Sequence, residues 1–253
     1  MPSLPEITVV VPAYGEEARI GSVVRSMPPS VRRIFVVDDA SRDGTADAAR
    51  AAAKATADER LTVVRHAQNR GVGGAIVTGY KAALAAGGDP NDAFVVMAGD
   101  AQMDPADLPR VAAPVLAGLA GYVKGDRFGA PDILAVMPKA RWAGGQVLSW
   151  MTSRAIGVPI HDSQCGYTAL ARWACASLDL DALWPRYGYP NDLLSQLALR
   201  GIPIREVPVR PVYAGEESGL RAYHVAGIAR LIARAYVKRL AAKGASTNTL
   251  KKA

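Results

Sequence analysis

The chain has 253 residues, of which 50% are hydrophobic and 21% charged, and its formal net charge is +7. This composition excludes a disordered chain and can bury the core of one large domain or two small ones. Two cysteines, Cys165 and Cys175, are too few for a disulfide framework or a four-ligand zinc site. No apolar run reaches the length of about 20 residues that crosses a bilayer, and no signal peptide is visible. We therefore expect a cytoplasmic protein that is soluble or bound to a membrane surface.

Buried strands and helices alternate along the first half of the chain. Apolar, β-branched runs predict strands at residues 7–11, 34–37, 61–64 and 94–97, and a fifth that begins at 122–123. Helical patterns lie between them, at residues 16–27, 44–57, 74–86 and 105–116. This alternation predicts an α/β fold with a mostly parallel central sheet flanked by helices. In such sheets, ligands bind beyond the carboxyl ends of the strands.

The second half is less regular. Its patterns predict helices at 141–156 and 193–200, a strand at 204–209 and a long final helix at 223–240. Because the chain contains no linker-like segment, we expect one main domain over residues 1–218. Residues 219–253 then form a basic amphipathic C-terminal helix and tail.

The positive charge is concentrated in that tail. Beyond Glu217 there are eight basic residues and no acidic residue, whereas residues 1–218 carry 22 basic and 23 acidic side chains. A nearly neutral body argues against a nucleic-acid-binding surface, so we expect no nucleic-acid partner.

The final helix has two possible roles. Arg230, Arg234 and Lys238 recur every four residues, and the apolar residues Ile228, Leu231, Ile232 and Ala235 lie on other faces. Such a helix can lie on an anionic membrane surface, joined there by Trp142, Leu148, Trp150 and Met151. The alternative is a helix that packs on the core and leaves its arginines in solvent.

Polar residues follow the first two strands. Tyr14 and Glu16 come directly after the first strand, where a ring can stack on a nucleobase and a carboxylate can accept a hydrogen bond from it; Glu16 can equally be an acid in a first helical turn. Asp38 and Asp39 end the second strand, and two adjacent carboxylates are costly without a partner such as a base or ribose hydroxyl. The following Asp43-Gly44-Thr45 is typical of a turn and helix cap.

A glycine-rich segment follows the third strand, at residues 69–75, and contains Gly73. It differs from a dinucleotide fingerprint, which follows the first strand, and this argues against an NAD-dependent oxidoreductase. Its N–H groups can approach a phosphate at the start of the next helix, although a bare glycine turn explains the pattern equally well.

Asp100 and Gln102 follow the fourth strand, two residues apart. Their oxygens can ligate a hard divalent cation that is held mainly by a diphosphate and water. One carboxylate and one amide are too few for a cage made of protein alone.

Taken in order, these motifs resemble family 2 glycosyltransferases with the GT-A nucleotide-sugar-binding fold. They are PAYGE at 12–16, DDASRDGT at 38–45, NRGVG at 69–73 and GDAQ at 99–102. The resemblance implies that the nucleotide sugar is bound by Pro12, Tyr14, Glu16, Asp39, Gly73 and Asp100. It also implies that Asp100 and Gln102 hold Mg²⁺ or Mn²⁺.

Further motifs are similar to the dolichyl- and polyprenyl-phosphate sugar synthases of that family. They are KGDRF at 124–128, DSQCGY at 162–167 and EVPV at 206–209. The chain departs from the family at Ala98, where an acid is common, and at Asp126, where serine often precedes the arginine. The donor sugar therefore stays open.

The resemblance implies an inverting transfer of a hexose from a UDP- or GDP-sugar to a polyprenyl or dolichyl monophosphate. The acceptor phosphate is already an anion near neutral pH, so it needs cations more than a general base. Arg127 and Arg141 are the candidates, although Arg141 can also be a solvated arginine at a helix start.

The alternative is a soluble family 2 enzyme that acts on a hydroxyl of a small molecule, glycan or peptide. A hydroxyl acceptor requires a base, and Asp192 lies where relatives carry a catalytic acid. Asp192 can instead orient the acceptor loop or cap a helix, and Asp162 is ambiguous in the same way. The sequence leaves a homo-oligomer possible.

Overall fold

The computed structural model describes residues 4–131, 133–212 and 222–250. Within them, seven strands form one sheet in the order β3-β2-β1-β4-β6-β5-β7. The strands are β1 (Ile7–Ala13), β2 (Val31–Asp38), β3 (Leu61–Arg65), β4 (Ala93–Val96), β5 (Tyr122–Asp126), β6 (Thr168–Ala171) and β7 (Ile204–Pro208). All pairings are parallel except those of β6, which runs antiparallel to both β4 and β5.

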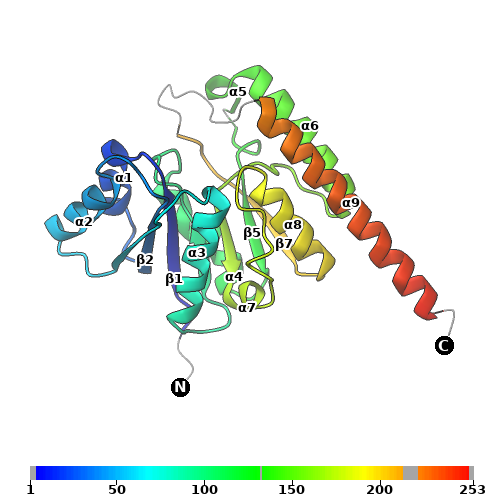
Figure 1. The fold of residues 1–253 in the computed structure, drawn as a ribbon, viewed down its shortest axis with the longest axis horizontal. Coiled ribbons are helices and arrows are strands. Elements are labelled where there is room, and N and C mark those ends of the chain that lie inside the picture. The colour runs from blue at the N-terminus through cyan, green and yellow to red at the C-terminus, as the bar shows by residue number, and fades with distance from the viewer. Residues whose placement is uncertain (1–3, 132, 213–221, 251–253) are drawn as a thin grey trace.

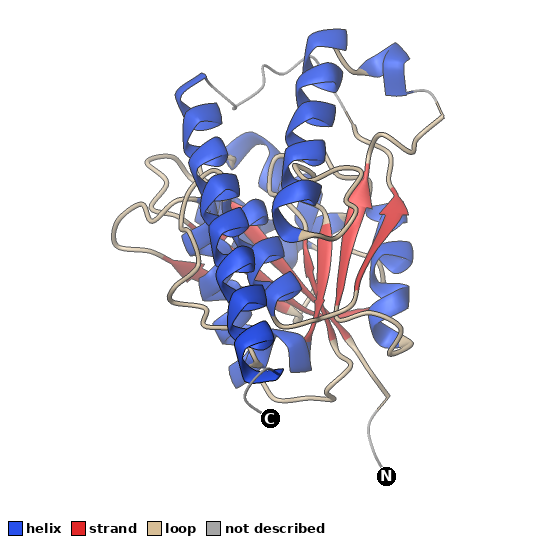
Figure 2. Cartoon of the chain, turned by 90° about the vertical axis from the view of Figure 1, so that its right-hand side faces the viewer, coloured by secondary structure: helices blue, strands red, loops and turns tan. Residues whose placement is uncertain are grey.

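Helices flank this sheet (Figures 1 and 2). They are α1 (Glu17–Arg25), α2 (Thr45–Ala55), α3 (Val72–Ala85), α4 (Leu108–Leu116), α5 (Ile133–Val136), α6 (Lys139–Ile156), α7 (Arg172–Ala176), α8 (Tyr189–Leu199) and α9 (Ala222–Leu250), with a short 3₁₀ helix at Pro105–Asp107. Helix α3 contacts β1 and β2, whereas α4 contacts β4, β5 and β6. The predicted α/β fold with a mostly parallel sheet is confirmed.

Every strand predicted from the sequence is present, but β6, α5 and α7 were not predicted. Strand β6 has only four residues, Thr-Ala-Leu-Ala, and half of them are alanine, so its composition does not distinguish it from the helix that follows. All four are buried, since β6 lies between β4 and β5. Its position in the sheet, rather than its local propensity, makes it a strand.

Strand β1 is buried along its whole length and lies between β2 and β4. The chain therefore reverses its direction of travel across the sheet at β1, and an open α/β sheet binds its ligands at such a reversal. The carboxyl ends of β1, β2 and β4, which carry the predicted donor-binding residues, meet there.

Helix α9 packs along α6 and also contacts α8, and its C-terminal half extends beyond the body of the protein (Figure 1). Its predicted apolar face is confirmed, because Ile228, Leu231, Ile232 and Ala235 are buried. Arg230 and Arg234 are exposed and Lys238 is half-buried. The predicted domain boundary at 218/219 lies outside the described residues.

The structure corrects one residue of the predicted lipid-facing set. Leu148 is 8% exposed and belongs to the main hydrophobic core, so it cannot contact a membrane. Trp150, two residues further along the same helix, is 62% exposed.

No helix among the described residues is both long and apolar enough to cross a bilayer. Cys165 and Cys175 are buried free thiols.

Candidate active site

Backbone hydrogen bonds join the carboxyl ends of the three strands that carry the predicted donor-binding residues. The Gly99 N–H donates to the Pro12 carbonyl at 3.1 Å, and the Asp39 N–H donates to the Ala13 carbonyl at 2.9 Å. These bonds continue the sheet pairing past the strand ends. The loops after β1, β2 and β4 are therefore held side by side.

The loop after β1 presents the predicted aromatic residue. Tyr14 is 53% exposed, so its ring is accessible to a ligand. The adjacent Gly15 N–H donates to the Ser41 hydroxyl at 3.1 Å, and the Glu16 N–H donates to the Thr45 hydroxyl at 2.8 Å. One hydroxyl comes from the loop after β2 and the other from the first residue of α2, and together they fix the backbone on the C-terminal side of Tyr14.

Asp39 is 3% exposed and its carboxylate organises the glycine-rich loop. Its Oδ1 accepts the Arg70 N–H at 2.8 Å, and its Oδ2 accepts the Gly71 N–H at 2.7 Å. Both oxygens of this buried carboxylate are therefore hydrogen-bonded, as buried polar atoms generally are. Asp39 thus has a structural partner in this loop, and its contact with a nucleotide stays a prediction.

His66, which the sequence reasoning missed, completes the surroundings of Asp39. Its Nδ1 lies 2.7 Å from Asp39 Oδ1, and its Nε2 lies 2.9 Å from the Thr78 hydroxyl. The ring is buried at the end of β3 and links that strand to α3. No sequence motif surrounds this histidine, so it could not be predicted as a site residue.

The glycine-rich loop is built for close backbone packing. Gly71 has φ +85°, and a Cβ at Gly73 would lie 2.4 Å from the Trp184 carbonyl oxygen. The Gly74 N–H donates to the Pro185 carbonyl at 3.0 Å. These contacts explain the glycines without a ligand. They agree with the second interpretation of this segment, a bare glycine turn.

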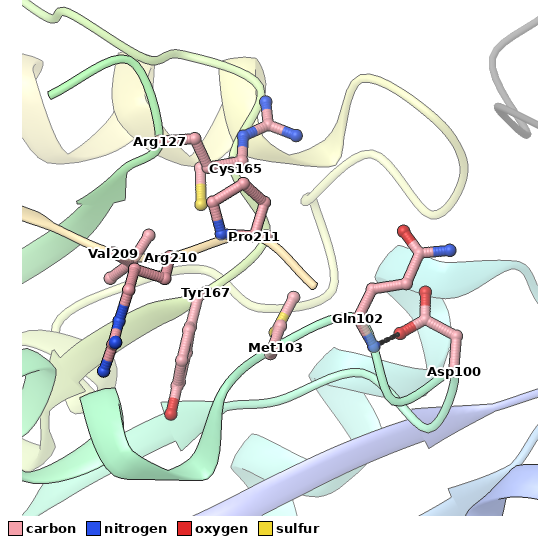
Figure 3. Close-up of a pocket in the computed structure, with 10 residues that line it drawn as sticks. Asp100, Gln102, Met103, Arg127, Cys165, Tyr167, Val209, Arg210 and Pro211 are labelled. Atoms are coloured by element: carbon pink, nitrogen blue, oxygen red, sulfur yellow. Dashed lines mark hydrogen bonds between the residues drawn. The ribbon is translucent and has the colours of Figure 1, made fainter. Parts of the chain in front are cut away.

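A pocket lies beyond β4 and β5 and brings Asp100, Gln102 and Arg127 together (Figure 3). Its other lining residues are Met103, Cys165, Gly166, Tyr167, Val209, Arg210 and Pro211. The segment after β7 crosses the Asp100 loop here, because Val212 N–H donates to the Gln102 carbonyl at 3.0 Å. Sequence reasoning missed this segment, since nothing in 209–212 indicates that it returns to β4.

The turn at Ala101 places Asp100 and Gln102 next to each other. Ala101 has φ +62°, and the Gln102 N–H donates to Asp100 Oδ1 at 3.0 Å (Figure 3). Among the described residues there is no cluster of three or more His, Cys, Asp or Glu side chains that could hold a metal. This donor set fits a hard cation that arrives with a diphosphate, and does not fit a permanent structural metal site.

Arg127 follows β5 and lies on the opposite side of this pocket from Asp100. Its guanidinium forms two hydrogen bonds with Asp162, from Nε at 2.7 Å and from Nη2 at 3.0 Å. Burial opposes the ionisation of Asp162, but the Arg127 guanidinium outweighs it and holds the pKa of that carboxyl below its ordinary value. Asp162 is therefore an ionised partner of Arg127 at neutral pH.

The two other predicted catalytic residues lie outside the lining of this pocket. Arg141 is in the first turn of α6 and half-buried. Asp192 is in the first turn of α8, 6% exposed, and its Oδ2 accepts the Trp184 N–H at 2.9 Å. Asp192 thus holds the turn against which Gly73 packs, and a catalytic role for either residue stays a prediction.

The mostly parallel sheet, the reversal at β1 and the acidic loop after β4 are features of the GT-A glycosyltransferase fold. Known structures agree on the fold: glucosyl-3-phosphoglycerate synthase from Mycobacterium tuberculosis, solved with Mn²⁺, UDP and phosphoglyceric acid, superposes with a TM-score of 0.67. The superposition covers 93% of this chain and 78% of that one, at 22% identity.

The model of the family "Glycosyl transferase family 2" matches residues 8–172, and this chain belongs to that family. It is a glycosyltransferase. One relative, the UDP-N-acetylglucosamine–dolichyl-phosphate N-acetylglucosaminyltransferase of Methanococcus voltae, is 29% identical over 82% of this chain and 86% of its own length. Another, the polyprenol monophosphomannose synthase of Mycolicibacterium smegmatis, is 30% identical over 79% of this chain and 75% of its own.

Proposed function

We propose that this glycosyltransferase moves a hexose from a UDP- or GDP-sugar to a polyprenyl or dolichyl monophosphate, with inversion at the anomeric carbon. The name of one relative includes dolichyl phosphate as acceptor, and the name of the other gives polyprenol monophosphomannose as its product. The pocket beyond β4 and β5 supports the same acceptor class, because it combines one carboxylate–amide pair with an arginine opposite. With a divalent cation held by that pair, such a site can neutralise two phosphorylated substrates at once.

The observation that carries the proposal is the scarcity of candidate bases. Among the described residues that line the pocket, Asp100 is the only carboxylate, and it belongs to the proposed metal pair. Asp192, the candidate base for a hydroxyl acceptor, is buried and hydrogen-bonded to the Trp184 backbone. A phosphate monoester is largely ionised at neutral pH and attacks without a base, which favours it over a hydroxyl.

The chain's own groups then have distinct tasks. Tyr14 and Glu16 hold the nucleotide beside the loops that Asp39 organises. Arg127, with Arg141 as a second candidate, holds the acceptor phosphate near the anomeric carbon. One acceptor oxygen forms a bond to that carbon from the face opposite the nucleoside diphosphate as the bond to the diphosphate breaks, so the configuration inverts.

Asp100 and Gln102 are the residues that would hold Mg²⁺ or Mn²⁺. When bound, such an ion neutralises the charge that develops on the departing diphosphate. The hard oxygen donors of this pair suit either ion and do not choose between them.

We also propose that the enzyme works at the cytoplasmic face of a membrane, because its acceptor is a lipid. Neither α6 nor α9 contains an acidic residue. A groove between them is lined by Trp150, Arg154, Tyr236 and Arg239, with the Arg154 guanidinium 5.9 Å from the Trp150 ring centroid. Aromatic rings beside arginines are suited to the headgroup region of an anionic membrane.

The acceptor is tested by a transfer screen with purified protein. UDP- and GDP-hexoses are combined with polyprenyl phosphate or with free sugars, phosphoglycerate and serine peptides, each with and without Mn²⁺. We expect metal-dependent transfer to polyprenyl phosphate. Transfer to hydroxyl acceptors alone would overturn the proposal.

Membrane binding is tested by liposome flotation. We expect salt-sensitive binding to vesicles that contain anionic lipid, and weaker binding of a Trp150→Ala/Tyr236→Ala variant. Leu119→Ala is the matched control, because Leu119 is 55% exposed in the loop after α4, outside this groove. Equal flotation of all three proteins would exclude the groove as the contact.

A further inference from the structure

Arg127 is held by a carboxylate from a distant part of the chain. Asp162, 35 positions away, is fully buried, whereas the Arg127 side chain is 16% exposed and reaches the pocket. The two side chains share two hydrogen bonds, and the Arg127 backbone N–H also donates to Asp162, at 3.2 Å. A two-pronged pair of this kind fixes the plane of the guanidinium as well as its position.

Asp162 is itself fixed by its own loop. Its Oδ1 accepts the N–H groups of Gln164 at 3.2 Å and Cys165 at 3.1 Å, in addition to its bond with Arg127. The carboxylate therefore cannot rotate without losing several hydrogen bonds. Its direction, and so the direction of Arg127, is set before any substrate binds.

Two residues of the sheet, one on β7 and one on β5, form hydrogen bonds with the backbone of this loop. Glu206 on β7 accepts the N–H groups of His161 at 2.8 Å and Asp162 at 3.0 Å. Its register partner on β5, Lys124, is completely buried and donates from Nζ to the Cys165 carbonyl at 2.5 Å. Burial lowers the pKa of the Lys124 amine, and the carboxylates of Asp162 and Glu206 oppose that shift.

We propose that Asp162 is a positioning residue for the transfer reaction: it orients Arg127 toward the acceptor phosphate, and Lys124 and Glu206 hold its loop in place. This inference rests on the proposed function, because it takes the acceptor to be the ligand of Arg127. An arginine that is already ordered loses little conformational entropy when the phosphate binds. The buried ion pair thus serves to fix the geometry of the Arg127 guanidinium.

The first measurement is steady-state kinetics of the full chain carrying Asp162→Asn, which keeps the shape and removes the charge. We expect kcat/KM for polyprenyl phosphate to fall by about 10- to 100-fold, the usual cost of a misplaced binding group. Affinity for the UDP- or GDP-nucleotide should stay within about twofold, because the nucleotide contacts lie in the other loops. Asp162→Glu, which restores the charge one methylene away, should recover part of the loss.

The second measurement separates positioning from a general structural role. If Asp162 acts through Arg127, then adding Asp162→Asn to Arg127→Met should cause little further loss in kcat/KM. Asp92→Asn is the matched control: Asp92 is also buried, but it lies at the amino end of β4 and accepts the Glu6 N–H at 2.8 Å. Fully multiplicative losses in the double variant, or an equal loss of kcat/KM with Asp92→Asn, would overturn the inference.

Two outcomes keep this inference distinct from the proposed function. If Asp162→Asn does not fold, the test is made with Arg127→Lys. Lysine keeps the charge but cannot form the two-pronged pair, so we expect a loss of kcat/KM as large as that of Arg127→Met. If the unchanged chain transfers sugar only to a hydroxyl, the proposed function fails. The same double-variant comparison, made with that acceptor, then decides whether Asp162 acts through Arg127.

Discussion

The loops after β1, β2 and β3 are held by backbone N–H groups that converge on side-chain oxygens, whereas the loops after β5 and before β6 combine such bonds with a buried ion pair. In the first region, Asp39 binds the N–H groups of Arg70 and Gly71. In the second, Asp162 binds Arg127. A carboxylate that receives backbone N–H groups makes a rigid loop for a ligand to approach. A carboxylate that also receives a guanidinium, as Asp162 does, directs a positive charge as well.

The largest expected effect is at Asp100 and Gln102, which lie between the two regions. In Asp100→Ala/Gln102→Ala, transfer should fall by about 1,000-fold, because metal ions contribute several kcal/mol to stabilising a diphosphate leaving group. Isothermal titration should show that UDP binding no longer depends on Mn²⁺. Asp104→Asn is the control in the same loop, and metal-dependent binding that persists in the double variant would refute the assignment.

The next effect tests the first region. Asp39→Asn replaces one acceptor oxygen by an NH₂ group that faces N–H donors, so the free energy of unfolding should fall by about 2–3 kcal/mol. Urea denaturation measures this loss. Asp43→Asn, in the exposed part of the same loop, should change it by much less. If the two variants are equally stable, Asp39 does not organise this region.

A substitution at Gly73 should have a somewhat smaller effect. The Cβ of Gly73→Ala would lie 2.4 Å from the Trp184 carbonyl oxygen, and such overpacking costs about 1–3 kcal/mol. Thermal unfolding should detect it. Gly144→Ala in α6 is the control, since a Cβ there meets nothing within 4 Å and the free energy of unfolding should be unchanged or raised. Equal melting temperatures would contradict the packing explanation.

Asp192 distinguishes the two acceptor classes. Asp192→Asn keeps an oxygen for the Trp184 N–H, so transfer to polyprenyl phosphate should fall by less than about tenfold. Transfer to any hydroxyl acceptor should fall by about 100-fold or more, because a general base contributes that much. The transfer assay is run with both acceptors, and similar losses with both would remove the distinction.

The smallest effect depends on pH and tests the second region. The hydrogen bond with Asp126, at 2.7 Å, raises the pKa of His161 above its ordinary value. The stability contributed by this pair is therefore fully present below about pH 6.5, the unfolded value, and is lost as the pH rises through the higher folded value. His161→Gln should remove that slope in urea-unfolding curves measured from pH 5 to 9. Parallel curves for both proteins would show that the pair contributes nothing.

Much of the first region could be predicted from the sequence because its candidate site residues come directly after strands. A buried strand fixes where its carboxyl end lies, and Tyr14 and Asp39 follow such ends within a few residues, as does Asp100 between the two regions. The residue that links Asp39 to α3, His66, was missed because it has no neighbours in sequence that mark its role.

The sequence by itself thus determined the fold class, the family and the position of the loops that carry the predicted donor-binding residues. Motifs, periodic burial and strand-end polarity are local properties of the chain. Only the tertiary structure decided that β6 enters the sheet antiparallel and that Asp162 meets Arg127. The same is true of Lys124, whose charge is buried beside the Cys165 loop. An ion pair between distant residues has no period along the chain, so its partners become known only when the sheet brings them together.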